Sequence, residues 1–238
     1  MRAVAISAVI FDWGGTLTPW HSVDQDTVWR QVCTPHFPGR GDEVAAAILA
    51  AELALWQACD DSQCSATLAD VFDRAGVTPT DDFLEAYFTA WDPHTFTDPD
   101  VIPLLGELRA RGIKAGVLSN TMWPRSAHER VFRRDNVLHL FDGAVYSSEI
   151  PWSKPHPEAF RAAMAAVGVT DPASCVFVGD RPYDDVHGAQ RAGMRAVLIP
   201  HSAVPAYDSA VPDAVITRLA DLPAHLDAWS APSSNAVR

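Results

Sequence analysis

The chain has 238 residues, of which 48% are hydrophobic and 20% charged, a composition typical of a globular protein with one large domain or two modest ones. Its formal net charge of −12 argues against nonspecific binding to nucleic acid or to anionic membranes. The longest apolar tract, residues 44–58, is too short for a membrane span and is interrupted by Glu52. With four cysteines in no zinc-site spacing and no visible signal peptide, we expect a soluble cytoplasmic protein.

The first predicted element is a buried strand over residues 8–11, followed by Asp12, two glycines and Thr16. Glycines allow a tight turn and a close approach of the backbone to a ligand. In open parallel α/β sheets, ligands bind beyond the carboxyl ends of the strands. From this stretch alone, the slightly favoured interpretation is that Asp12 serves only as a turn or cap residue. Three later segments favour a substrate site.

Residues 21–97 differ in character and are predicted to form an all-helical insertion. Helices are expected over residues 42–60, 65–75 and 80–91, with Ser65 and Thr80 as N-caps of the last two. Between His21 and Asp98 the sequence holds fourteen acidic residues, three arginines and no lysine, so most of the net charge lies here. We interpret these acidic residues as a solvated face of the insertion. The functional alternative is that they weakly disfavour polyanionic substrates such as nucleic acid.

From Asp100 onward, predicted strands and helices alternate. Strands are expected at residues 113–118, 144–146, 175–178, 195–199 and 214–216, and helices at residues 100–111, 125–134, 156–167, 184–192 and 219–229. Alternation with short links predicts a parallel sheet covered by helices on both faces. The predicted fold class is therefore α/β: a doubly wound parallel sheet formed by residues 1–20 and 98–229, with an inserted all-helical cap over residues 21–97. The polar tail, residues 230–238, is expected to be disordered.

Polar residues gather where the predicted strands and their loops end. They are Asp12, Ser119, Lys154 and Asp180, the last followed by Asp184 and Asp185. Parallel strands bring these ends to one edge of the sheet. There a carboxylate can attack phosphorus and form an aspartyl-phosphate, while lysine and serine bind the phosphoryl oxygens. Paired carboxylates offer hard oxygen ligands for Mg²⁺.

These residues, in this order, resemble the motifs of the haloacid dehalogenase superfamily of aspartate-nucleophile hydrolases. The first motif matches as FDWGGTL at residues 11–17 and the second as VLSN at residues 117–120. The third matches as KPHP at residues 154–157, and the fourth as VGDRPYDDVHGA at residues 178–189, followed by AGM at residues 192–194. The resemblance covers the core, roughly residues 4–20 and 98–216, and the family places a helical cap directly after the first motif. It implies a Rossmann-like core, hydrolase activity and Mg²⁺ as cofactor.

Carried over by position, the resemblance gives each motif residue a role. Asp12 is the expected nucleophile, and Ser119 and Lys154 are the expected catalytic phosphate-binding groups. The expected Mg²⁺ ligands are Asp12, the backbone carbonyl of Gly14, Asp180 and Asp185. Asp184 is the alternative to Asp185 or, more simply, the N-cap of the following helix. The substrate and its phosphate are expected to contact Gly15, Thr16, Trp20, Asn120 and Trp123.

One position departs from the pattern of the family's phosphatases, which carry a second aspartate two residues after the nucleophile. That aspartate protonates the leaving oxygen and later activates water, and here its position is Gly14. General acid–base catalysis typically contributes ~10²–10⁴-fold, so poor leaving groups should react slowly. Three hypotheses follow: a substrate with a good leaving group such as an anomeric sugar phosphate or an aryl phosphate, a replacement acid, or phosphate binding with little turnover. Candidate replacement acids are His21, Asp24, His94 and Asp98.

Other branches of the superfamily also lack this second aspartate. Phosphonoacetaldehyde hydrolases have a similar first motif but need a cap lysine for a Schiff base, and the lysines of this chain are Lys114 and Lys154, both outside the cap. Dehalogenases of this fold work without metal and lack a pair such as Gly179 and Asp180. The sequence therefore predicts a Mg²⁺-dependent phosphatase for a small phosphorylated metabolite, a monomer or homodimer without nucleic-acid or membrane partners. A dehalogenase, a phosphonatase-like C–X hydrolase and a non-catalytic phosphate-binding protein are the alternatives.

Overall fold

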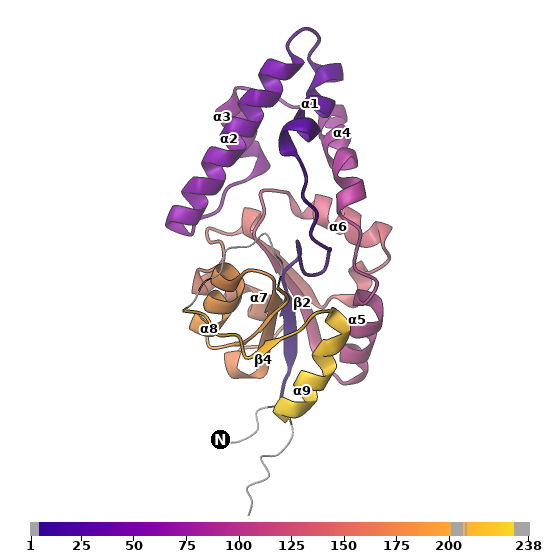
Figure 1. Ribbon diagram of the computed structural model, residues 1–238, viewed down its shortest axis with the longest axis vertical. Helices are drawn as coiled ribbons and strands as arrows, with labels where there is room; N and C mark the ends of the chain where they lie inside the picture. Colours follow the sequence, from indigo (N-terminus) through magenta and orange to yellow (C-terminus); the bar gives the residue numbers. More distant parts are fainter. Residues whose placement is uncertain (1–4, 201–206, 208, 231–238) are drawn as a thin grey trace, which may run out of the picture.

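The core is a six-stranded parallel sheet, seen in a computed structural model that describes residues 5–200, 207 and 209–230 (Figure 1). The strand order is β3-β2-β1-β4-β5-β6. The strands are β1 (Ala8–Phe11), β2 (Lys114–Ser119), β3 (Gly143–Tyr146), β4 (Cys175–Gly179), β5 (Arg195–Leu198) and β6 (Ala214–Val215). The predicted doubly wound α/β core is confirmed. The tail predicted to be disordered lies outside the described residues, apart from Ser230.

Helices cover both faces of the sheet because successive strand side chains point to opposite sides. In β1, Val9 and Phe11 join a buried cluster with residues of α5 (Val101–Ala110), α6 (Arg125–Arg134) and α9 (Leu222–Ser230). Ala8 and Ile10 join a second cluster with α7 (Pro157–Ala166) and α8 (Gly188–Arg191). The apolar run before Asp12 is therefore a central strand that is buried on both sides.

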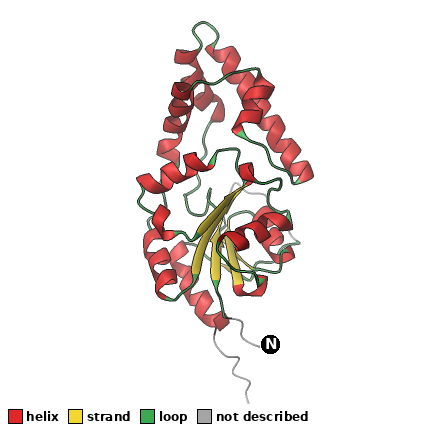
Figure 2. Ribbon diagram, turned by 180° about the vertical axis from the view of Figure 1, so that it is seen from behind, coloured by secondary structure: helices red, strands yellow, loops and turns green. Residues whose placement is uncertain are grey.

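The cap carries four helices, which stand at the carboxyl-terminal edge of the sheet (Figures 1 and 2). They are α1 (Gln25–His36), α2 (Gly41–Ser62), α3 (Leu68–Ala75) and α4 (Asp81–Trp91). These helices enclose a hydrophobic cluster of their own, in which Trp29 stacks on Tyr87 with ring centroids 4.3 Å apart. None of the helices that the structure describes is long and apolar enough to cross a membrane.

Two details of the cap differ from the sequence prediction. Helix α1 was not predicted, and it contains Pro35. The proline occupies the last turn, where the loss of one backbone hydrogen bond costs little of the helix. Helix α3 begins after Thr67 and not after Ser65, since Thr67 and Asp70 form a capping box. In this box the Asp70 N–H donates to Oγ1 of Thr67, and the Thr67 N–H donates to Oδ2 of Asp70.

The Thr67 cap gives a stability prediction. Thr67→Ala removes the hydroxyl that accepts from the Asp70 N–H, and should lower the free energy of unfolding by about 1 kcal/mol and Tm by about 2–4 °C. Ser65→Ala is the matched control, because the Ser65 hydroxyl makes no hydrogen bond among the described residues. Thermal denaturation followed by circular dichroism measures both variants. An equal loss of Tm in both would contradict the assignment of the cap to Thr67.

Candidate functional site

Asp12 lies directly after the central strand β1, which pairs with β2 on one side and β4 on the other. The loop that follows is closed by hydrogen bonds from the Gly15 N–H to the Thr18 carbonyl (2.8 Å) and from the Thr18 N–H to the Trp13 carbonyl (2.9 Å). Within the described part of the chain, these bonds leave the N–H groups of Trp13 and Gly14 unused. Two backbone donors beside Asp12 can therefore meet an anion.

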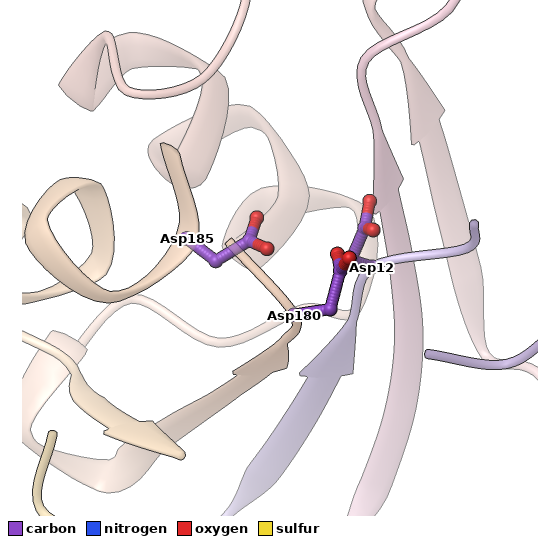
Figure 3. Close-up of side chains that lie close together, drawn as sticks. All are labelled: Asp12, Asp180 and Asp185. Atoms are coloured by element: carbon purple, nitrogen blue, oxygen red, sulfur yellow. The ribbon is translucent and has the colours of Figure 1, made fainter. Parts of the chain in front are cut away.

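Three buried carboxylates meet beside this loop: Asp12, Asp180 and Asp185 (Figure 3). Asp180 follows β4, and Asp185 lies in a π-helical turn, Pro182–His187, that precedes α8. One oxygen of each carboxylate lies within 4.8 Å of the corresponding oxygens of the other two. The helix predicted over residues 184–192 is thus two elements, and the wider first turn brings the Asp185 carboxylate to the sheet edge.

Lys154 supplies the positive charge of this group. Its Nζ donates to Oδ1 of Asp12 and to Oδ1 of Asp185, each at 2.6 Å. The Asn120 side-chain amide makes two hydrogen bonds to the Lys154 backbone. Its Nδ2 donates to the Lys154 carbonyl at 2.9 Å, and its Oδ1 accepts from the Lys154 N–H at 2.7 Å. Asn120, predicted to contact phosphate, therefore positions the lysine in this structure.

Two glycines permit this close packing. A Cβ at Gly15 would lie 2.5 Å from Oδ2 of Asp180, and the Gly15 φ of +83° also disfavours a side chain. A Cβ at Gly179 would overlap the Asp185 carboxyl. Gly14 differs from both, because no heavy atom lies within 4 Å of a Cβ built there. The first-motif loop therefore has room for a side chain at residue 14 and none at residue 15.

Burial and mutual repulsion govern the ionisation of the site. Burial raises the pKa of Asp180 to about 8, and the neighbouring Asp12 and Asp185 add to the increase. Burial also raises the pKa of Asp12, against the lowering effect of the Lys154 ammonium. Burial by itself lowers the pKa of Lys154, but the two adjacent carboxylates raise it above its ordinary value. The Lys154 ammonium contacts two of the three carboxylates, and the Arg181 guanidinium also lowers the pKa of Asp12 and of Asp180. Three ionised carboxylates still outnumber these two cationic groups, and a bound cation would balance the excess.

The sequence of this chain matches the haloacid dehalogenase-like hydrolases over residues 6–193, a range that includes every residue of this group. The chain belongs to this family. A glyceraldehyde 3-phosphate phosphatase of Methanopyrus kandleri is 34% identical over 157 residues, which cover 63% of this chain and 66% of the relative. The match thus spans just under two thirds of the length of that protein.

Two further relatives of this haloacid dehalogenase-like hydrolase align with a larger share of the chain. A phosphonoacetaldehyde hydrolase of Bordetella pertussis is 28% identical over 216 residues, with 82% of this chain and 72% of the relative covered. The crystal structure of a haloacid dehalogenase-type phosphatase from Thermococcus onnurineus superposes with a TM-score of 0.70 at 24% identity, covering 93% of this chain and 98% of that one. The structural similarity supports the fold.

A cavity of about 500 Å³ lies between the core and the cap of the hydrolase. Most of the predicted site residues line it: Asp12, Gly14, Gly15, Trp20, Ser119, Asn120, Trp123 and Lys154. Asp180 and Asp185 lie beneath this surface and are almost fully buried. Thr16 is buried and does not belong to the lining, whereas the neighbouring Thr18 does.

The candidate replacement acids fall into two pairs. His21 and His94 line the cavity, with ring centroids 6.0 Å apart. Asp24 instead caps α1 by accepting from the N–H of Asp26, and Asp98 accepts from the N–H of Asp100. Neither of these aspartates belongs to the cavity lining. Only the two histidines are therefore placed to meet a substrate.

Asp184 is not the N-cap that the sequence suggested. It lies inside the π-helical turn, and its Oδ2 accepts from Nη1 of Arg181 at 3.3 Å. It lines the cavity but does not belong to the group formed by Asp12, Asp180 and Asp185. Burial, together with the nearby Asp185, raises the pKa of Asp184 to about 6.

Sequence reasoning did not identify which residues of the cap helices line the cavity. Helices α2 and α4 add Glu52, Trp56, Tyr87 and Trp91 to its lining. A signal for Glu52 was present, because it is the charged residue that interrupts the longest apolar tract. The aromatic residues carried no such signal, since hydrophobic packing is the ordinary role of tryptophan and tyrosine in a helix.

Replacing Gly15 tests the packing of the first-motif loop. Gly15→Ala forces a Cβ onto the Asp180 carboxylate at a positive φ, and should lower the free energy of unfolding by about 1–3 kcal/mol. Gly14→Ala at the adjacent residue is the control, because a Cβ there meets open space. Its Tm should stay within about 1–2 °C of wild type, since a tolerated substitution changes the free energy of unfolding by about 0.5 kcal/mol or less. Differential scanning calorimetry compares the two. A stable Gly15→Ala variant would contradict this geometry.

Proposed function

We propose that this hydrolase removes phosphate from small phosphomonoesters through an aspartyl-phosphate at Asp12, with Mg²⁺ as the cofactor. The convergence of Asp12, Lys154, Asp180 and Asp185 beside a substrate-sized cavity carries this proposal. Phosphoryl transfer depends mainly on positioning and on neutralising charge, and this group supplies both. The phosphatase among the relatives supports the same activity.

The donor set fits a hard divalent cation. Asp12, Asp180 and Asp185 offer only oxygen ligands, which Mg²⁺ prefers, and the carbonyl of Gly14 would add a fourth. Burial raises the pKa of Asp180, and repulsion by Asp12 and Asp185 adds to this effect; a cation held there would offset the repulsion. When bound, Mg²⁺ would hold the phosphate next to Asp12 and screen it from the carboxylates.

Asp12 is arranged for nucleophilic attack. Lys154 binds its Oδ1, which leaves Oδ2 to attack phosphorus. The Asp12 O–P bond forms as the ester P–O bond breaks, and the electron pair leaves with the alcohol oxygen. Water then attacks the aspartyl-phosphate, which restores the carboxylate and releases inorganic phosphate.

Several donors can hold the transferred group during both steps. The Lys154 ammonium and the Ser119 hydroxyl line the cavity beside Asp12, and the backbone N–H groups of Trp13 and Gly14 make no competing hydrogen bonds among the described residues. Donors fixed before the reaction stabilise developing charge without reorganisation. Asn120 contributes through Lys154, whose backbone it holds.

The leaving oxygen receives no proton from residue 14. Gly14 has no side chain, so the bond to a poor leaving group breaks without acid assistance from this loop. We therefore propose substrates whose alcohol is a good leaving group. His21 and His94 are the cavity residues that could supply a proton in place of the missing aspartate.

Cleavage of a C–P bond is the second candidate, because a phosphonoacetaldehyde hydrolase matches 82% of this chain. That chemistry needs a cap lysine for a Schiff base, and the cap has none. A Schiff base also requires an unprotonated amine. The ammonium of Lys154 is bound by two carboxylates, which raise its pKa and keep it protonated.

The proposal predicts metal-dependent hydrolysis of p-nitrophenyl phosphate, whose leaving group needs no protonation. Turnover should occur with Mg²⁺ and stop in EDTA, and Asp12→Asn should lower kcat at least about 10³-fold because the nucleophile is lost. Asp61→Asn, an exposed change on α2, is the control and should retain activity. Release of halide from 2-chloropropionate, or of acetaldehyde from phosphonoacetaldehyde, by an enzyme inactive on phosphate esters would contradict the proposal.

Restoring the missing acid gives a second prediction. Gly14→Asp places a carboxyl in open space beside the leaving oxygen, and should raise kcat for an alkyl phosphate such as glycerol 3-phosphate by about tenfold or more. Gly14→Asn has nearly the same size but no acidic proton, so it should give no such gain. Steady-state kinetics with the alkyl phosphate measure kcat for both variants and for wild type. Equal rates for the two would show that protonation of the leaving group is not limiting.

A further inference from the structure

The cavity has two chemically different ends. At the core end lie the cationic side chains of the lining, Lys154 and Arg181, together with the carboxylates of Asp12 and Asp184. Helix α2 adds Glu52, Trp56 and Asp60 at intervals of four residues, which places them on one face of the helix. Asp60 lies near Arg181, whereas Glu52 lies two turns farther along the helix, at the cap end. The three arginines of the cap all lie outside the lining. The end that would meet the alcohol portion of a phosphomonoester is therefore acidic.

Glu52 is the unbalanced charge at this end. It is 7% exposed, and its Oε2 accepts from Nε1 of Trp29 at 2.8 Å. Among the described residues this is the hydrogen bond that its carboxylate makes, and the residue lines the cavity. Burial raises the pKa of Glu52, and no cationic side chain contributes against this effect. Asp60 differs, because Arg181 lowers its pKa against the effect of burial.

Three aromatic rings form a corner of the same cavity. Tyr87, Trp91 and Trp123 have ring centroids 5.8–6.4 Å apart, and each pair of planes is inclined by 73–79°. Trp29 links this corner to the carboxylate, since its ring stacks on Tyr87 while its Nε1 binds Glu52. Tyr87 is 1% exposed and forms the base of this corner, so Trp91 and Trp123 are its partly exposed rings. Aromatic faces attract cations, and such rings beside a carboxylate suit an ammonium group better than any other charge.

We propose that the cap end selects phosphomonoesters whose alcohol portion carries a positively charged nitrogen, as in amino alcohols and quaternary ammonium alcohols. This inference rests on the proposed phosphatase function and gives it a substrate class. The phosphate binds at Lys154 and the nitrogen binds between Glu52 and the aromatic corner, so the substrate has one orientation. A carboxylate or second phosphate on the alcohol is repelled by the same end.

The chemistry of such a substrate matches the loss of the acid at Gly14. As the Asp12 O–P bond forms, the ester P–O bond breaks and its electrons move onto the alcohol oxygen, which takes up a proton from water; the hydroxide that remains is consumed when it attacks the aspartyl-phosphate in the second step. A nearby ammonium withdraws electrons and stabilises this oxygen as it leaves. The substrate then supplies part of the assistance that residue 14 does not give.

A pair of isosteric substrates tests the inference. Phosphocholine and 3,3-dimethylbutyl phosphate have the same shape, but the second replaces the charged nitrogen with carbon. Wild-type enzyme with Mg²⁺ should show a kcat/KM at least about tenfold higher for phosphocholine. Glu52→Gln keeps an acceptor for Trp29 and removes the charge, and should reduce this ratio at least about threefold. Glu43→Gln, an exposed change on the same helix, should keep the wild-type ratio.

p-Nitrophenyl phosphate separates failure of this inference from failure of the phosphatase. If that ester is hydrolysed and the isosteres react equally, the inference is overturned while the phosphatase stands; an unchanged ratio in Glu52→Gln also overturns it. If p-nitrophenyl phosphate is not hydrolysed, the proposed phosphatase activity is wrong. The inference about the cap end is then tested separately, by measuring the binding of choline alone. Choline should then change the tryptophan fluorescence at lower concentration than 3,3-dimethylbutanol, and equal or absent responses overturn the inference.

Discussion

One buried ammonium, that of Lys154, links the loops at the carboxyl ends of three strands of the sheet. It bonds to Asp12 after β1 and to Asp185 after β4, while Asn120 after β2 fixes its backbone. Removing one partner of a buried ion pair costs on the order of 3–5 kcal/mol, because the other charge is left without compensation. The three strand ends are therefore coupled through one side chain. The same arrangement leaves more carboxylates than Lys154 can pair with, and this imbalance supports the proposal that the site binds a cation together with phosphate.

The fold and the members of the site were predictable from the sequence because both follow from short-range patterns. Apolar runs such as residues 8–11 mark buried strands, and the topology of a parallel sheet then brings Asp12, Ser119 and Asp180 to one edge. What each side chain contacts depends on packing that no pattern records. Asn120 was expected to contact the substrate or its phosphate, and its bonds to the Lys154 backbone were not predicted. Likewise, the structure places the start of α3 after Thr67, two residues beyond the predicted cap at Ser65.

The cap and the catalytic loops are linked at the backbone. The N–H of Ser153, next to Lys154, donates to the carbonyl of Gln63 at the end of α2, and the N–H of Leu68 donates to the carbonyl of Met122, just after the second motif. The position of α2, which carries Glu52, is thus coupled to the segments that carry Lys154 and Ser119. A net charge summed over the cap could not show this, because most of its acidic residues are solvated while Glu52 alone is buried among apolar neighbours.

Two features that are far apart in the chain point to the same property of the substrate. Under the proposed function, Gly14 supplies no proton to the leaving oxygen, so the alcohol itself must stabilise negative charge as the ester bond breaks. Under the proposed substrate class, Glu52 and the partly exposed rings of Trp91 and Trp123 favour positive charge where that alcohol binds. A cationic group there would stabilise the bound substrate and the departing oxygen together. Because the oxygen becomes more negative as the bond breaks, the attraction would grow toward the transition state, and binding by the cap would contribute to the rate as well as to specificity.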